Sequence, residues 1–135
     1  MANIVNDIVC VTGSRWGDVD PLLVNNALTV RLNFGRGSFV LFHGGNAGDE
    51  RSVDLIAHQW ALARGVSVLA FPYPSHLGKA GGQARNARML QSALIASYSA
   101  TVELIAFPSP VKSSSGTWGC VRAAEALNIK VTVHR

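Results

Sequence analysis

The sequence has few cysteines and lacks any long apolar run. No run approaches the ~20 apolar residues that a membrane-spanning helix needs. The first residues include neither a basic segment nor a long apolar one, so we expect a cytoplasmic protein without a signal peptide. The two cysteines, Cys10 and Cys120, form no C-x-x-C pair, which excludes the common zinc and thioredoxin-type motifs. We expect both to be reduced, half-buried thiols.

Motifs of several enzyme classes are also missing from the sequence. It has no G-x-x-x-x-G-K-[ST] loop, so ordinary ATPase chemistry is not indicated. No G-x-G-x-x-G follows the first apolar segment, so the standard dinucleotide fingerprint is missing. It also lacks H-E-x-x-H and G-x-S-x-G, which mark zinc proteases and α/β-hydrolases. No metal-ligating cluster is evident, and we expect neither a metal nor a cofactor.

The composition that remains is typical of one globular domain over 1–135. Hydrophobic residues make up 48% of the 135 residues and charged residues only 15%, so the chain can bury a core. The net charge of +4 suits anionic partners. The net charge alone does not distinguish a small phosphate-bearing ligand from a nucleic acid.

Strand and helix patterns alternate along the whole chain. Asp20 and Pro21 suit the N-cap and first position of a helix, and Gly65 suits a C-cap. The expected strands are apolar throughout, which indicates that both faces of their sheet are covered. We therefore predict a single α/β domain, a Rossmann-like three-layer sandwich with a parallel five-stranded sheet. Its strands are expected at 4–12, 38–42, 66–71, 101–107 and 130–134, and its helices at 19–33, 50–64, 85–97 and 117–127.

Glycines gather in the loops that follow the first four predicted strands. In a parallel sheet these loops meet at one edge, where ligands bind. Glycine lets backbone N–H groups approach a ligand, and a helix N-terminus behind such a loop attracts phosphate. Eight of the 13 glycines lie there: Gly13, Gly44, Gly45, Gly48, Gly78, Gly81, Gly82 and Gly116.

Two segments are the best phosphate-binding candidates. The first supplies hydroxyls, a glycine and a helix start through Ser114, Ser115, Gly116 and Thr117. Alternatively, this segment is only a well-capped helix start with Ser115 as its N-cap. The second candidate is Gly13-Ser14-Arg15, where Arg15 can make two hydrogen bonds to a phosphate. Arg15 is otherwise a surface residue after a tight turn.

Several charged and aromatic side chains accompany these loops. Asp49 is the candidate catalytic residue, as an acceptor for ribose hydroxyls or a general base, unless it only caps the helix expected at 50–64. We expect His43 to be a hydrogen-bonded structural histidine rather than a base. Trp16 and Trp118 either stack on a base or pack within the protein. The predicted cationic rim consists of Arg15, Lys79, Arg85, Arg88 and Lys112, although Arg88 equally suits a solvent-facing helix position.

Together, the four loops resemble the YspA-like branch of the SLOG superfamily, whose relatives include the Lonely Guy phosphoribohydrolases. The resemblance covers nearly the whole chain. It rests on Gly13–Trp16, on His43-Gly44-Gly45 with Gly48-Asp49, on 78–81 with Arg85-Asn86 and Met89-Leu90, and on 105–108 with 115–117. It implies a Rossmann-like fold, a nucleotide-derived ligand, a role in phage or bacterial signalling, and a homodimer. The ligand site that it implies includes Gly13, Ser14, Arg15, Gly44, Gly45, Asp49, Arg85, Asn86, Ser115, Gly116 and Thr117.

One departure from the family pattern bears on activity. The phosphoribohydrolases carry P-G-G-x-G-T-x-x-E, but Cys120 occupies the glutamate position here, and Glu125 lies more than a turn further on. Glycosidic cleavage needs a carboxylate near the sugar. The leading hypothesis is therefore a domain that binds a phosphate-bearing nucleotide or nucleotide derivative, with an N-glycosidase or phosphoribohydrolase acting on a nucleoside monophosphate or NAD-like compound as the alternative.

Two further expectations concern partners. Single-stranded nucleic-acid binding is a second alternative because the chain is basic, but the sequence lacks aromatic residues interleaved with basic ones along a strand. The apolar side chains of the helix segment 89–97 either form the surface of the expected homodimer or belong to the core. No membrane partner is expected.

Overall fold

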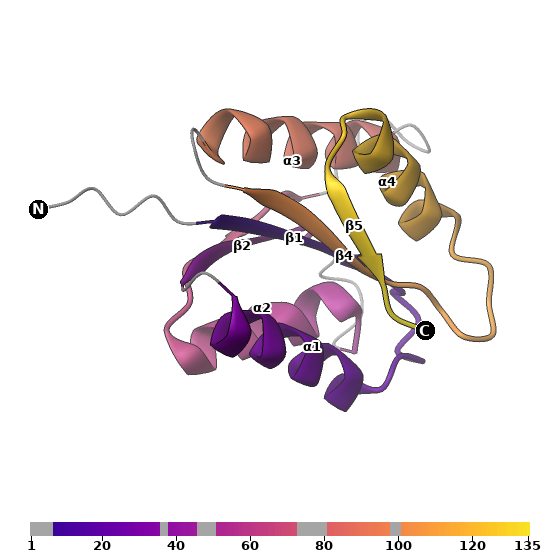
Figure 1. Ribbon diagram of the computed structural model, residues 1–135. Helices are drawn as coiled ribbons and strands as arrows, with labels where there is room; N and C mark the ends of the chain where they lie inside the picture. The colour runs from indigo at the N-terminus through magenta and orange to yellow at the C-terminus, as the bar shows by residue number, and fades with distance from the viewer. Residues whose placement is uncertain (1–6, 36–37, 46–50, 73–80, 98–100) are drawn as a thin grey trace, which may run out of the picture.

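Helices and strands alternate along the chain, as the sequence pattern predicts (Figure 1). The computed structural model describes residues 7–35, 38–45, 51–72, 81–97 and 101–135. The strands are β1 (Asp7–Gly13), β2 (Phe39–His43), β3 (Val68–Ala70), β4 (Val102–Phe107) and β5 (Lys130–Val133). The helices are α1 (Pro21–Phe34), α2 (Val53–Arg64), α3 (Gly81–Ser97) and α4 (Ser115–Ala126).

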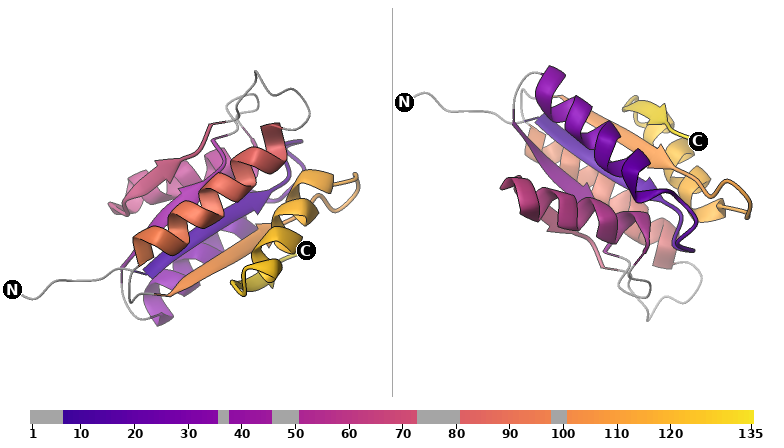
Figure 2. Two further views of the ribbon diagram at one scale, coloured as in Figure 1. Left: turned by 90° about the horizontal axis from the view of Figure 1, so that it is seen from above. Right: turned by 90° about the horizontal axis from the view of Figure 1, so that it is seen from below.

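The sheet is parallel throughout, with the strand order β3-β2-β1-β4-β5. Helices α1 and α2 cover one face, and α3 and α4 cover the other (Figures 1 and 2). This arrangement confirms the predicted Rossmann-like three-layer sandwich. The strand order reverses beside β1, whose neighbours are β2 and β4. The C-terminal ends of these central strands therefore form the edge where doubly wound sheets bind ligands.

Alternate residues of β1 supply the two halves of the core. Val9 and Val11 pack toward α1 and α2, whereas Ile8 and Cys10 pack toward α3 and α4. All four side chains are buried. Because helices cover both faces of the sheet, the strand is apolar at every one of these positions, which explains the continuous apolar run in the sequence.

The predicted helix ends are partly confirmed. Asp20 caps α1 by accepting a hydrogen bond from the backbone N–H of Leu22 at 2.9 Å. Gly65 ends α2 in the left-handed conformation, with a φ of 68°. The start of α2 differs from the prediction, because Ser52 is its N-cap and accepts from the N–H of Leu55 at 3.2 Å. The helix thus begins at Val53, after its expected start at residue 50, and its N-cap is Ser52 in place of the proposed Asp49, which lies outside the described residues.

Helix α3 begins four residues before its expected start at Arg85. Glycine has a low helix propensity, so the pair Gly81-Gly82 concealed this first turn. Met89 and Leu90 are buried in the core, whereas Leu94 is 39% exposed and Ile95 83% exposed. The helix segment that we considered for dimerisation therefore divides between core and surface.

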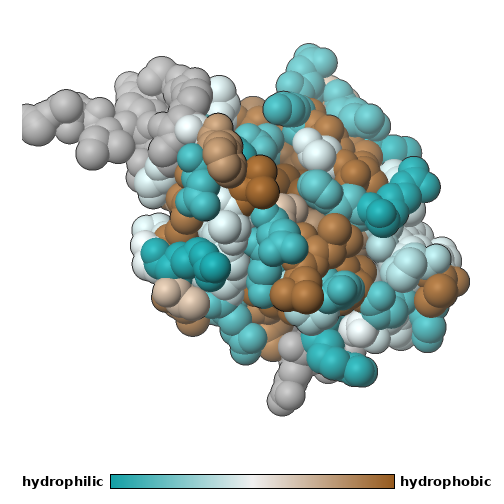
Figure 3. All heavy atoms as spheres, turned by 60° about the horizontal axis from the view of Figure 1, so that its bottom comes forward, coloured by the Kyte–Doolittle hydropathy of each residue, from teal (hydrophilic) through white to brown (hydrophobic). Residues whose placement is uncertain are grey.

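The outer face of α1 and α2 shows apolar side chains among polar ones (Figure 3). Among the large apolar residues of the two helices, Phe34 is 83% exposed, and Leu22 and Leu62 are also exposed. Helices among the described residues are too short or too polar to span a bilayer.

Candidate functional site

The C-terminal edge of the central strands brings together loops that are far apart in the sequence. The N–H of Ser14, just after β1, donates to the carbonyl of Phe107 at the end of β4, over 2.9 Å. The carbonyl of Ser14 accepts from the N–H of Val53, the first residue of α2, over 3.0 Å. These backbone contacts fix the loop after β1 between β4 and the start of α2.

Gly13 lies at the closest approach of β1 to α2. A Cβ atom added at this position would lie 2.6 Å from the Cβ of Val53. Glycine is therefore required here for helix–strand packing. The structure supports this role for Gly13 independently of any ligand.

Arg85 is the central cation of the edge. Its Nη1 donates to the carbonyl oxygen of Gly44 at 2.7 Å, and its Nε donates to Oδ1 of Asn86 at 2.8 Å. The side chain reaches from the first turns of α3 to the end of β2 and is only partly buried. A fixed guanidinium at the end of a central strand is suited to binding an anion.

Asn86 connects the start of α3 with the start of α4. It is only 4% exposed, and its Nδ2 lies 3.4 Å from the carbonyl oxygen of Gly116, to which it donates. Thr117 is equally buried, whereas Ser115 is exposed. Three of the predicted site residues, Asn86, Gly116 and Thr117, therefore lie near one another.

The start of α4 lacks the expected serine cap. The N-cap residue is Ser114, and its side chain makes no capping hydrogen bond to the helix. Its hydroxyl oxygen instead accepts from the N–H of Ser109 at 2.7 Å. The proposal that Ser115 is the N-cap is wrong, and Ser114 leaves the N–H groups of the first turn available.

Asp54 is a site residue that sequence reasoning missed. It is the second residue of α2, is only 7% exposed, and its Oδ2 lies 2.9 Å from the position that a Cβ on Gly44 would take. Nη1 of Arg85 lies 2.1 Å from the same position. Asp54 could have been identified from the sequence as an acidic residue in the first turn of a helix that follows a glycine-rich loop. Placing the helix start at residue 50 assigned Asp54 to the second turn and hid that signal.

His43 is confirmed as a buried, hydrogen-bonded histidine. Its Nδ1 accepts from the N–H of Gly45 at 2.9 Å, so its Nε2 carries the proton and donates to Nδ1 of His58 at 2.8 Å. Burial lowers the pKa of His43 to about 4, and electrostatic interactions with His58 and Arg85 act in the same direction. His43 therefore holds the loop after β2 in place as a neutral ring.

A second network joins the loops after β1 and β4. The hydroxyls of Ser14 and Ser109 both donate to the carboxylate of Asp18, and the bond from Ser14 measures 2.6 Å. The hydroxyl of Ser109 also accepts from the N–H of Lys112 at 2.8 Å. The Ser14 hydroxyl, which we predicted to bind phosphate, is thus engaged within the protein.

The same network keeps Asp18 ionised. Burial acts to raise its pKa, but the hydrogen bonds from Ser109 and Ser14 and the charge of Lys112 hold the pKa below its ordinary value. Asp18 therefore acts as a fixed negative charge that joins two loops. No sequence pattern indicated Asp18, because it lies outside the glycine-rich segments that we considered.

Trp16 lies at the rim beside this network and is 43% exposed. The Arg15 guanidinium lies 4.7 Å from its ring centroid, and the Lys112 ammonium 4.6 Å from the same centroid. Trp118, in contrast, is partly buried against the core, with the Arg135 guanidinium 5.1 Å from its ring. The two tryptophans thus differ, because Trp118 packs against the core whereas Trp16 remains exposed.

Cys120 occupies the position of the glutamate in the phosphoribohydrolase pattern. Its thiol is buried, as is that of Cys10, and both cysteines are free. Burial raises the pKa of Cys120 to about 11, although a hydrogen bond with Thr12 and the charge of Arg85 act in the opposite direction. The expected reduced thiols are confirmed, but they are fully rather than half buried. This position therefore supplies a neutral group.

Other predicted site residues lie apart from this cluster or outside the described structure. Arg88 is exposed on α3, which agrees with the solvent-facing alternative. Asp49 and Lys79 lie outside the described residues, as do Gly48 and Gly78. Within the described segments, no three histidine, cysteine or acidic side chains gather closely enough to hold a metal ion.

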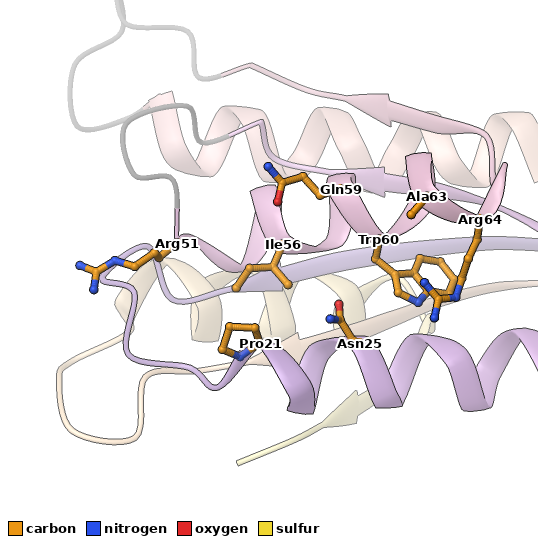
Figure 4. Close-up of a pocket in the computed structure, with 8 residues that line it drawn as sticks. All are labelled: Pro21, Asn25, Arg51, Ile56, Gln59, Trp60, Ala63 and Arg64. Atoms are coloured by element: carbon orange, nitrogen blue, oxygen red, sulfur yellow. The ribbon is translucent and has the colours of Figure 1, made fainter.

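Two surface hollows are lined by residues that do not belong to the strand-end cluster. One, of about 370 Å³, lies between α1 and α2, where Arg64 stacks over Trp60 at 5.3 Å and Arg51 marks one end (Figure 4). The other, of about 700 Å³, includes Asp7 and Glu103 at the opposite edge of the sheet. Comparison with known proteins adds no assignment, because no family model matches the chain and no curated protein is significantly similar to it.

Proposed function

We propose that the chain binds a phosphate-bearing nucleotide or nucleotide derivative at the C-terminal edge of its sheet, in a sensing or sequestering role. The observation that carries the proposal is the convergence of Arg85 with the open first turn of α4. Asn86 joins the two through its hydrogen bond to Gly116. The resemblance to the YspA-like branch of the SLOG superfamily points to the same class of ligand.

The chemistry of Arg85 supports an anionic ligand. A guanidinium has five N–H donors, and Arg85 uses one on Gly44 and one on Asn86. Its position is fixed before any ligand binds, so little side-chain entropy is lost on binding. The N-terminus of α4 adds N–H groups that the Ser114 side chain does not cap, and the positive end of a helix dipole.

Binding without hydrolysis is supported by the residue at position 120. Oxocarbenium stabilisation in glycosidic cleavage requires a carboxylate near the sugar. Cys120 supplies a buried thiol with a raised pKa instead. A site with phosphate-binding groups and no glutamate at this position is suited to retaining its nucleotide.

Calorimetric titration with AMP, ADP-ribose and a cyclic nucleotide tests the proposal. Arg85→Gln should weaken the binding of whichever nucleotide binds by at least about tenfold, because it removes a charge-assisted contact. Arg88→Gln is the matched control, since Arg88 is exposed on the same helix. Failure of the unsubstituted protein to bind any of these nucleotides, or equal effects of the two substitutions, would overturn the proposal.

Asp54 favours one second candidate, an N-glycosidase acting on a nucleoside monophosphate or NAD-like compound. Its buried carboxylate lies beside Gly44 at the same edge as Arg85. Such a carboxylate can act as a general base that activates a water molecule for attack on the sugar. Chromatography of a nucleotide mixture after incubation should then show a released free base, and Asp54→Asn should prevent the release while nucleotide binding persists. Intact nucleotides after long incubation would remove this candidate.

A further inference from the structure

The second cationic feature of the strand-end edge is the group formed by Arg15, Trp16 and Lys112. Arg15 and Trp16 belong to the loop after β1, and Lys112 belongs to the loop after β4. Both positive groups lie over the same indole ring, at 4.7 Å and 4.6 Å from its centroid. A cation over an exposed indole gains roughly 0.5–1 kcal/mol, so the ring can gather two side chains that otherwise repel each other.

The backbone on both sides of this group is held in place. The N–H of Trp16 donates to the Ser14 hydroxyl at 3.1 Å, and the N–H of Lys112 donates to the Ser109 hydroxyl at 2.8 Å. Both hydroxyls in turn donate to Asp18. The two cations are therefore brought together by one continuous hydrogen-bonded frame.

The charge balance leaves this group positive. Asp18 is a nearby counter-charge that acts on Lys112, and its carboxylate oxygens already accept from two hydroxyls. Among the described residues of this group, one carboxylate faces two cations, which leaves an excess of one positive charge. An anionic group of a ligand would relieve the repulsion between Arg15 and Lys112.

We propose that Arg15 and Lys112, positioned by Trp16, form a second anion subsite, so that the ligand carries two anionic groups. One group binds at Arg85, and the other binds at Arg15 and Lys112 beside Trp16. This inference rests on the proposed function and narrows it to diphosphate-type ligands such as ADP or ADP-ribose. Trp16 is then a positioning residue, because two cations already lie over its ring.

Titrations with AMP, ADP and ADP-ribose test the second subsite. We expect the unsubstituted protein to bind at least one of the two diphosphates at least about tenfold more tightly than AMP. The double substitution Arg15→Ala with Lys112→Ala should reduce this ratio to about twofold or less and leave the affinity for AMP nearly unchanged. Arg64→Ala is the control, because Arg64 also lies over a tryptophan, Trp60, but between α1 and α2.

Substitution of Trp16 separates positioning from base stacking. Trp16→Leu should lower the preference for the diphosphate while AMP binding persists, and Trp16→Phe should retain much of the preference. Equal weakening of AMP and diphosphate binding by Trp16→Leu would show that the ring stacks on the base, which overturns the inference. An unchanged ratio in the double variant would also overturn it, while AMP binding that depends on Arg85 would leave the proposed function standing. Absence of binding of all three nucleotides would remove both.

Discussion

The guanidinium of Arg85 occupies the space that a side chain on Gly44 would need. The two residues are joined by a 2.7 Å hydrogen bond from Nη1 to the carbonyl oxygen of Gly44. A Cβ at this position would lie 2.1 Å from Nη1 and 2.9 Å from Oδ2 of Asp54. The glycine of the β2 loop therefore lets a cation and a carboxylate approach the same stretch of backbone.

Gly44→Ala should displace Arg85 and weaken nucleotide binding. The added methyl group and the guanidinium cannot occupy the same space, so the side chain must give up its contact with the carbonyl. We expect a loss of roughly 1.5–3 kcal/mol in the free energy of unfolding, the usual range for a hydrogen bond that involves a charged group. Affinity should fall at least about tenfold, as for Arg85→Gln. Urea denaturation and calorimetric titration measure the two effects, and unchanged affinity would place the ligand away from Arg85.

Two glycines of α4 form a matched pair that tests where the ligand binds. A Cβ on Gly116 meets no atom within 4 Å, and one on Gly119 meets only Nη2 of Arg122, at 4.0 Å. Alanine at either position should stabilise the protein by roughly 0.5–1 kcal/mol, because helical glycine is less favourable than alanine. Gly116 lies in the first turn, and its new Cβ would tilt toward the helix N-terminus. Gly116→Ala should therefore weaken ligand binding, whereas Gly119→Ala should not.

Thermal denaturation and ligand titration of the two glycine variants test this prediction. The stability measurement shows that each variant folds, so a loss of affinity in Gly116→Ala alone can be assigned to steric conflict with the ligand. Equal affinities in the two variants would argue against binding at the start of α4.

Local patterns predicted the fold because each depends on neighbouring residues. The apolar run of β1 indicated a sheet covered on both faces, and Asp20 with Pro21 marked the start of α1. The start of α2 was misplaced because Ser52 resembles many other serines in the sequence until its hydrogen bond to Leu55 is seen. That error of a few residues was enough to hide Asp54.

The parts of the site that escaped prediction depend on contacts between distant segments. Asp18 accepts from Ser109, which is 91 residues further along the chain. Nothing in either loop indicates the other, and the contact arises only because β1 and β4 are neighbours in the sheet. For the same reason, the sequence suggested that the hydroxyls of Ser14 and Ser114 bind phosphate, whereas the structure shows them bonded within the protein.

Arg31 should be important for stability at the edge of the sheet opposite the proposed site. It donates to Asp7 and Glu103, each at 2.9 Å, and the Asp7 side chain is only 3% exposed. Removing the guanidinium breaks an ion pair with the buried Asp7 and another with the partly buried Glu103, so Arg31→Met should cost about 3–5 kcal/mol in the free energy of unfolding. Arg64→Met is the comparison, because the exposed Arg64 should matter by less than about 0.5 kcal/mol. Urea denaturation at neutral pH distinguishes the two, and ligand affinity should change in neither.

His43 should make the stability of the protein fall in mild acid. Its pKa is lowered from 6.5 to about 4, chiefly by burial, so the folded state binds its proton less readily than the unfolded state does. The stabilisation is thus fully present above pH 6.5 and is lost progressively as the pH falls toward 4, by up to about 3 kcal/mol. Protonation also breaks the hydrogen bond from the N–H of Gly45, because Nδ1 must then carry a proton. Asp18, whose pKa lies below 3.8, contributes only in stronger acid.

Urea denaturation at intervals from pH 8 to pH 4.5 measures this dependence, and two variants assign it. His43→Gln is expected to be less stable at pH 8, because its side chain cannot reproduce both ring hydrogen bonds, but to lose most of the slope below pH 6.5. His134→Gln is the control and should keep the slope. His134 stacks on Phe107 near the end of β5 and does not belong to the pair of His43 and His58. If the slope persists in His43→Gln, another group takes up the proton, and the His43 ring does not cause the loss of stability in acid. A slope that disappears only with His43 would tie acid sensitivity to the loop that carries Gly44 and Gly45, and nucleotide affinity should then decline over the same pH range.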